Sequence, residues 1–264
     1  MRKNLAAARL AVLNQLEYRI NYLIDAAIQP AVATVIEVTL WLAILSGMGL
    51  KSLGGFGREY YLAYALWSTF MGRITTNWMY EFIMLDEIDT GKVNAILVRP
   101  ISFYEFYFSQ FLGYKMVTAV FSFVLPLGAC WIFQAPVIVE RLPLMFLLLA
   151  YYLAFTFTIS FCIACLAFFM NRAQSLTGMK NMMMWTLTGE LIPLDLYPEP
   201  FRSWMMHSPF ASGVYVPVAY ITGRIGTPLV LQSFVSITAG LIVFAGVGAV
   251  LWRSGMRAYT GTGA

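Results

Sequence analysis

Two charged residues interrupt stretches of the chain that are otherwise apolar and long enough to cross a bilayer. Glu37 lies in one such stretch and Arg73 in the next. A charge in the middle of a bilayer costs about 3 kcal/mol or more, so both side chains must face protein or water. At about 1.5 Å per residue along a helix, the two lie at similar depths. They form a candidate intramembrane ion pair, with two alternatives: Arg73 snorkels alone, or either residue lines a substrate path.

Residues that carry enzymatic chemistry are sparse. His207 is the one histidine, and no G-x-S-x-G motif supplies a nucleophile for it. The phosphate-binding pattern G-x-x-x-x-G-K-[ST] is absent, because Lys92 is followed by Val93. Cys162 and Cys165 form a C-x-x-C with no histidine or second pair nearby, which favours small packing residues over metal or redox chemistry. We therefore expect no catalytic, cofactor-binding or metal-binding residue, and no enzyme activity in this chain.

The composition is that of a membrane protein. Of the 264 residues, 60% are hydrophobic and 11% are charged, against about 25% charged in a soluble domain. The mean hydropathy of +0.72 excludes a water-soluble fold. The formal net charge is only +4 and the basic residues lie at segment ends, so nucleic acid is not an expected partner.

Five apolar segments predict membrane-spanning helices from their length and flanking charges. They cover residues 27–48, 60–80, 116–133, the uncharged stretch between Arg141 and Arg172, and 228–252. A sixth, residues 175–196, is weaker because Lys180 and Glu190 interrupt it. The count of Lys and Arg on each side is the same for five and for six spans, so charge alone does not choose between them.

Three further segments lie outside these spans. Residues 1–25 have the pattern of an amphipathic helix on the membrane surface. The connection that begins at residue 81 is expected to continue the second span as a short helix to Thr90, break at Gly91 and stop at Arg99-Pro100. Residues 193–226 are rich in proline and aromatic residues, which predicts short interfacial or re-entrant helices.

Two passages resemble a known family. Residues 91–102, GKVNAILVRPIS, resemble the glycine and L-x-R-P-I-S signature in the cytoplasmic loop of ABC-2 type permeases, in particular the small bacterial six-helix permeases. Residues 191–198, LIPLDLYP, resemble the L-P-L-D-F-F-P segment before the last span of that family. The family's later P-F, Y-x-P and glycine positions match 209–210, 215–217 and Gly223.

The resemblance implies an all-α integral membrane protein, a single domain over residues 1–264. It would have an N-terminal connecting helix, six spans, a cytoplasmic coupling helix within 81–102 and extracytoplasmic re-entrant helices within 193–226. It also implies assembly with a dimer of a separate ABC ATPase, which would hold ATP and Mg, and with a second permease, identical or homologous. The bacterial inner membrane would be the location, and membrane lipid a further partner.

The function that follows is the permease subunit of an ATP-driven exporter of an amphipathic or lipid-like substrate. A secondary transporter and a non-transporting scaffold subunit are the alternatives. The residues expected to contact the ATPase are Asp86, Glu87, Ile88, Asp89, Gly91, Arg99 and Pro100. The residues expected to form an extracytoplasmic gate are Pro193, Asp195, Pro198, Pro209, Phe210 and Pro217. Both termini are expected in the cytoplasm, and Glu190 at the far interface.

Overall fold

The computed structural model describes residues 2–17, 20, 24–47, 52–53, 56–170 and 173–259, which are mostly helical. The longer helices are α1 (Arg2–Glu17), α3 (Gln29–Gly47), α4 (Arg58–Thr75), α5 (Trp78–Asp89), α7 (Phe103–Phe133), α8 (Leu142–Cys165), α9 (Gln174–Leu187) and α12 (Thr227–Ala258). The short ones are η1 (Ile24–Ile28), α6 (Asn94–Leu97), η2 (Val139–Arg141), η3 (Leu166–Phe168), η4 (Leu194–Leu196), α10 (Phe201–His207), η5 (Phe210–Gly213) and α11 (Tyr215–Ile221). Strands β1 (Ser52–Leu53) and β2 (Phe56–Gly57) form one antiparallel pair.

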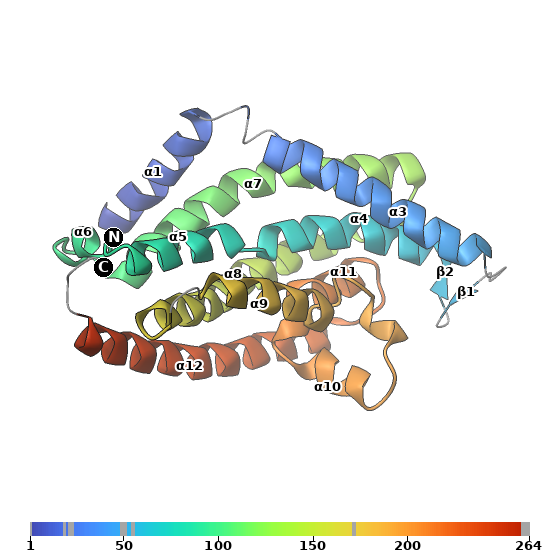
Figure 1. The fold of residues 1–264 in the computed structure, drawn as a ribbon. Coiled ribbons are helices and arrows are strands. Elements are labelled where there is room, and N and C mark those ends of the chain that lie inside the picture. The colour runs from blue at the N-terminus through green and yellow to red at the C-terminus, as the bar shows by residue number, and fades with distance from the viewer. Residues whose placement is uncertain are drawn as a thin grey trace.

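The helices form an elongated bundle in which the chain passes repeatedly from one end to the other (Figure 1). These passes are α3, the α4–α5 pair, α7, α8, α9 and α12. The strand pair, α10 and α11 lie towards one end, which we call the cap end. The turn that contains α6 lies at the opposite end with both marked chain ends, and we call it the turn end (Figure 1). The arrangement agrees with the all-helical fold expected from the sequence.

Four helical segments of the described residues are long and apolar enough to cross a membrane: Gln29–Gly47, Phe103–Phe133, Val139–Phe168 and Thr227–Ala258. The third expected span therefore belongs to a longer helix. It starts at Phe103 because Ser102 caps it, accepting a hydrogen bond from the backbone of Glu105 in a capping box. The helix passes Lys115 without a break, since this lysine is buried and donates to the backbone oxygen of Arg73.

The two remaining passes are shorter than a standard span. The second is divided, because Thr76 is extended and separates α4 from α5. The fifth, α9, has 14 residues, about 21 Å of helix against a hydrocarbon core about 30 Å thick. The weak sixth segment of the sequence is thus a helix too short for a full span, followed by non-helical backbone. Such backbone is tolerated at membrane depth only where protein covers it.

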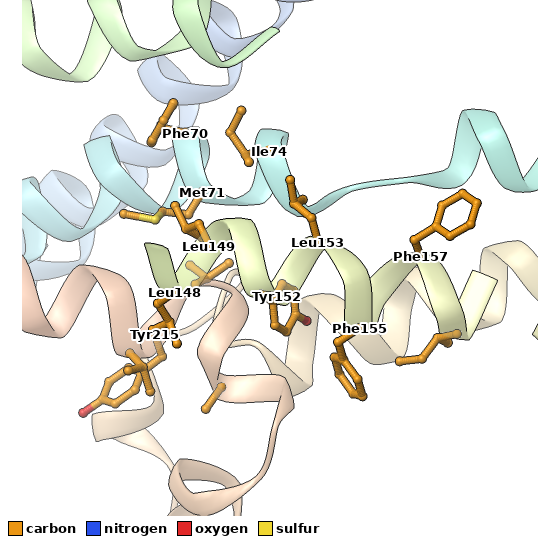
Figure 2. Packing of buried hydrophobic residues seen from close by; sticks show 14 of the residues in the cluster. Phe70, Met71, Ile74, Leu148, Leu149, Tyr152, Leu153, Phe155, Phe157 and Tyr215 are labelled. Carbon is orange, nitrogen blue, oxygen red and sulfur yellow. The ribbon is translucent and has the colours of Figure 1, made fainter. Parts of the chain in front are cut away.

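Helix α8 is the centre of the bundle. Its most apolar window is 67% buried, against 11–19% for the other three candidate spans. Figure 2 shows Phe70, Met71 and Ile74 of α4 beside Leu149 and Leu153 of α8. Close packing and dispersion, more than the exclusion of water, hold helices together in lipid.

Small residues bring the outer helices close to their neighbours. A Cβ on Gly240 of α12 would lie 2.6 Å from the ring of Phe155 on α8, so only glycine fits there. Helix α1 lies along α7, with Ala7 and Ala11 buried and the backbone of Ala8 against Gly113. Leucines on the other side of α1 are exposed, as expected for a helix at a membrane surface: Leu5, Leu10 and Leu13.

Candidate functional site

The turn between α5 and α7 has the shape expected from the sequence. Helix α5 ends at Asp89, and the next residue, Thr90, caps it: its backbone and side chain both donate to the backbone oxygen of Asp86, at 2.9 and 2.6 Å. Gly91 follows with a φ of 73°, a conformation that favours glycine. The short helix α6 then ends before Pro100, and Ser102 starts α7. The result is a compact, hydrogen-bonded turn at one end of the bundle.

Most of the turn residues expected to contact a partner are accessible. Asp86, Asp89, Arg99 and Pro100 are exposed. Lys92 lies 2.9 Å from Asp86, and this hydrogen bond and charge raise the pKa of Lys92. An exposed ion pair of this kind contributes little stability and stays available to a partner.

The assignment of Ile88 as a contact residue is wrong, because Ile88 and Ile96 face inward. Both are 4% exposed and belong to the chain's own core. Their hydrophobic role is to hold the turn against the bundle. The apolar residues that the turn presents outward are Leu97 and Val98, 41% and 84% exposed. A partner would therefore meet Val98, with charged residues around it.

Both ends of the described chain reach this turn. Lys3 of α1 donates to the backbone oxygen of Pro100 at 2.9 Å. Tyr259, which follows α12, donates to the oxygen of Gly91 at 3.4 Å. The turn and both chain ends thus lie at one end of the bundle (Figure 1).

The expected direct ion pair between Glu37 and Arg73 is not formed. Glu37 accepts hydrogen bonds from Ser68 and Thr69 of α4, at 2.8 and 2.9 Å. Arg73 lies about one turn further along α4 and donates to Gln29 at 3.2 Å. The reason is register: α3 and α4 are antiparallel neighbours, and the level of Glu37 on α3 corresponds to residues 68 and 69.

A buried ion pair joins Glu81 on α5 to Lys180 on α9. Lys180 Nζ contacts Glu81 Oε2 and also donates to Asn77 Oδ1 at 3.0 Å and Ser160 Oγ at 3.2 Å. Glu81 is 0% and Lys180 9% exposed. Asn77 Nδ2 donates to the oxygen of Thr156 on α8 at 2.8 Å. One polar network therefore links three passes, at the point where α4 and α5 separate.

Sequence reasoning missed this pair. Glu81 was assigned to the start of a cytoplasmic segment, but it lies one turn inside α5 and within the bundle. The available signal was Lys180, since a lysine in an apolar helix needs an acidic partner.

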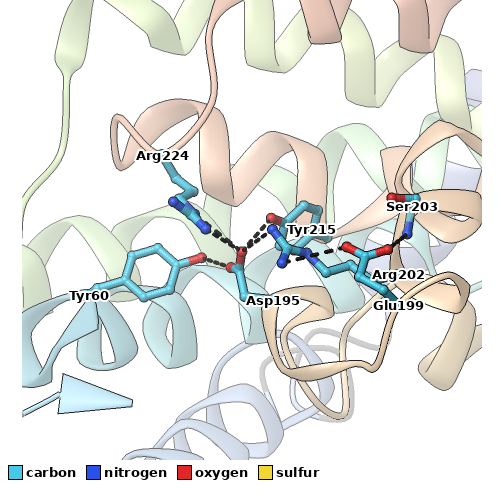
Figure 3. Close-up of polar contacts among 7 residues, drawn as sticks. All are labelled: Tyr60, Asp195, Glu199, Arg202, Ser203, Tyr215 and Arg224. Carbon is cyan, nitrogen blue, oxygen red and sulfur yellow. Dashed lines mark hydrogen bonds and ion pairs between the residues drawn. The ribbon is translucent and has the colours of Figure 1, made fainter. Parts of the chain in front are cut away.

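At the cap end, Asp195 is the centre of a second buried cluster (Figure 3). Its carboxylate accepts from Tyr60 of α4 at 2.8 Å and from Tyr215 of α11 at 3.0 Å. Arg224 forms an ion pair with it at 2.9 Å, and Arg202 approaches to 3.9 Å. Burial opposes the charge on Arg224, but the hydrogen bond and charge of Asp195 outweigh it and raise its pKa. The cluster attaches segment 193–226 to α4.

The other residues expected to form a gate are spread over this segment. Pro193 is buried and precedes η4, whereas Pro198 is exposed. Pro209 precedes η5, and the ring centre of Phe210 lies 5.6 Å from that of Phe155. Pro217 is buried within α11. Asp195 is therefore the residue among them that makes specific polar contacts.

Arg141, directly before α8, contacts the same segment. Its guanidinium lies 4.8 Å from the ring centre of Tyr220 and donates to the backbone oxygens of Tyr220 and Ile225, at 2.7 and 2.9 Å. The carbonyls at the end of α11 are satisfied in this way.

The remaining candidate residues have structural contacts. Cys162 donates to the oxygen of Phe244 at 3.2 Å, and Cys165 is buried. The Nδ1 atom of His207 lies 2.7 Å from the oxygen of Ser203. These contacts agree with packing roles for all three residues.

Comparison with known protein families gives one match. The family of ABC-2 family transporter proteins matches residues 31–263. No curated protein matches the chain.

Proposed function

The chain belongs to the ABC-2 transporter family, and from this premise we propose that it is the permease subunit of an ATP-driven exporter with a separate ATPase. Members of this family are membrane subunits for transport and are not themselves catalytic. In the proposed complex, ATP and Mg are bound by the partner ATPase. The bacterial inner membrane is the proposed location.

The observation that carries the proposal is the α5–α7 turn. Gly91 allows the chain to turn there, the buried Ile88 and Ile96 anchor the turn to the bundle, and the turn presents Val98 and charged residues outward. An exposed apolar side chain with charges at its rim is suited to a cleft in a partner protein. We place the ATPase dimer at this turn, and the turn and both termini in the cytoplasm.

Two networks offer a route from the turn to the cap end. The buried Glu81–Lys180 pair connects α5, which leads to the turn, with α9. Helix α9 in turn leads into segment 193–226, which the Asp195 cluster attaches to α4. We propose that movement at the turn is passed along these elements and opens the cap end as an extracytoplasmic gate.

We propose six membrane passes and a second permease subunit. Six passes agree with both described ends lying at the turn end. Helix α3 contacts the rest of the bundle through α4 and leaves a row of apolar residues exposed: Val32, Val35, Ile36 and Leu40. A second copy or a homologous permease, together with lipid, would cover this face, and an amphipathic substrate would pass between the two permeases.

Purification of the tagged chain from its native membrane tests the proposal. We expect a P-loop ATPase to copurify and the assembly to hydrolyse ATP, and replacement of the ATPase P-loop lysine should abolish that activity. Absence of an ATPase together with transport driven by an ion gradient would instead show a secondary transporter. Absence of both activities would show a scaffold subunit.

A further inference from the structure

A cavity of about 270 Å³ lies between α3, α4 and the end of α9. Its apolar wall includes Pro30 and Ala33 of α3 and two indole rings, Trp78 and Trp185. Both tryptophans are partly exposed, at 41% and 46%. The volume accommodates a head group with a short apolar portion and no whole lipid.

The side chain of Glu190 lines this cavity, beside α4. Helix α9 ends early, and Gly189 then adopts a φ of 80° while its oxygen accepts from Tyr64 at 2.6 Å. The Glu190 carboxylate rests directly on Gly72 of α4, in the space that a Cβ at that position would occupy. The turn at Gly189 thus places the carboxylate against the backbone of α4.

No cation of the described residues pairs with Glu190. Arg73 lines the same cavity and donates to Gln29 at 3.2 Å. The charge of Glu37, a second carboxylate, acts on Glu190, and the hydrogen bonds of Glu37 come from hydroxyls. Two partly buried carboxylates near each other attract a positive charge.

We infer that this cavity binds the ammonium group of an organic cation. The carboxylate of Glu190 would offset the charge, and the indoles of Trp78 and Trp185 would contact the alkyl groups on nitrogen through cation–π interactions. This inference rests on the proposed function and deepens it, because the cavity adjoins α3, along whose exposed face a substrate would pass between the two permeases. The substrate class is then an amphipathic cation.

The test uses benzyltrimethylammonium as the probe and neopentylbenzene, its uncharged carbon isostere, as the reference. Binding to the purified permease in a neutral detergent is followed by tryptophan fluorescence. We expect saturable binding of the cation that Glu190→Gln weakens about tenfold or more, since a charge contact in a low-dielectric cavity is lost. The matched control is Glu140→Gln, an exposed carboxylate on η2, which should leave binding unchanged.

Two further variants keep the test decisive if Glu190→Gln folds poorly. Trp185→Leu removes a partly exposed indole and should weaken binding of the cation more than binding of the isostere. Gly72→Ala places a methyl group where the carboxylate rests and should also weaken binding of the cation. Equal binding of cation and isostere, or an affinity within about twofold of wild type in folded Glu190→Gln and Trp185→Leu, overturns the inference.

Failure of the inference is distinguishable from failure of the proposed function. If the ATPase copurifies and hydrolyses ATP but the cation does not bind, the permease assignment stands and the cation site is wrong. If the cation binds and no ATPase copurifies, the site stands and the ATP-driven mechanism is wrong. In the intact complex, the cation should also raise the rate of ATP hydrolysis, and Glu190→Gln should remove that increase.

Discussion

The Nζ atom of Lys180 lies 3.0 Å from Oδ1 of Asn77, so helix α9 is attached to the residue at which the second pass breaks. Asn77 adopts a φ of −143° outside the helical region, and its amide group also binds α8. The break between α4 and α5 is thus compensated by polar contacts to two other helices. A polar residue at such a break satisfies groups that lipid cannot.

The first prediction concerns the buried pair. Lys180→Met leaves Glu81 buried without its cation and should destabilise the permease by about 3–5 kcal/mol. The double variant Lys180→Met with Glu81→Gln should recover part of this loss. Thermal unfolding in detergent measures the loss of stability in the single variant and its recovery in the double variant. Lys92→Met, which removes an exposed pair, is the control and should unfold as the wild type does; additive losses at 81 and 180 would contradict the coupling.

The second prediction concerns the turn. Gly91→Pro cannot adopt the φ of 73° found there, because proline fixes φ near −65°. It should abolish ATP-driven transport and reduce recovery of the ATPase, while the chain still inserts in the membrane. The combined change of Asp86, Glu87 and Asp89 to Ala should act in the same direction. Normal recovery and transport in both variants would exclude this turn as the docking site.

A third prediction separates the two faces of the turn. Val98→Glu changes a residue that is 84% exposed, so it should weaken ATPase recovery without changing the melting temperature. Ile96→Ala removes a buried side chain and should lower stability by about 2–5 kcal/mol. Pull-down of the ATPase and thermal unfolding of the permease alone should therefore respond to different variants. A stable Val98→Glu permease that retains its ATPase would show that this residue is not at the contact.

The fourth prediction concerns the cap end. Asp195→Asn keeps the shape of the side chain but removes the charge that faces Arg224 and Arg202. It should therefore lower the free energy of unfolding by about 3 kcal/mol. Hydrogen exchange should rise within residues 193–226 and remain unchanged at the turn. The control is Glu199→Gln, whose carboxylate is largely exposed and should contribute at most about 1 kcal/mol. Unchanged exchange in Asp195→Asn would show that the cluster does not hold the segment.

A fifth prediction tests the topology. Single cysteines at Val98 and Arg257 should be protected from an impermeant thiol reagent in intact cells, and one at Ser203 should react. The native cysteines are buried, so labelling of the unsubstituted chain gives the background signal. Labelling of Arg257→Cys from outside would contradict six passes.

The general architecture was predictable because it follows from composition and local rules. Apolar length indicated the long helices, and Gly91 with Pro100 indicated the turn. The proline-rich composition of 193–226 excluded a single helix there, and the structure has four short ones.

The polar contacts were not predictable, because they depend on which helices become neighbours. Glu37 and Arg73 lie at similar depths but meet different partners, since α3 and α4 pack one turn out of the expected register. Glu81 and Lys180 lie 99 positions apart in sequence, and only the packing of α5 beside α9 brings them together. Glu190 likewise reaches the cavity because α9 ends at Leu187. Hydropathy alone did not predict where this helix ends.

The short, lysine-bearing helix α9 also constrains how the protein is made. A lysine at the centre of an inserting helix is penalised by about 2.5–3.5 kcal/mol, and α9 has only 14 residues to offset it. Its acidic partner Glu81 precedes it in the chain and is synthesised first. The insertion machinery therefore has to keep the divided α4–α5 pass nearby until α9 emerges, so biogenesis of this permease depends on retention of early helices and not on release of each helix in turn.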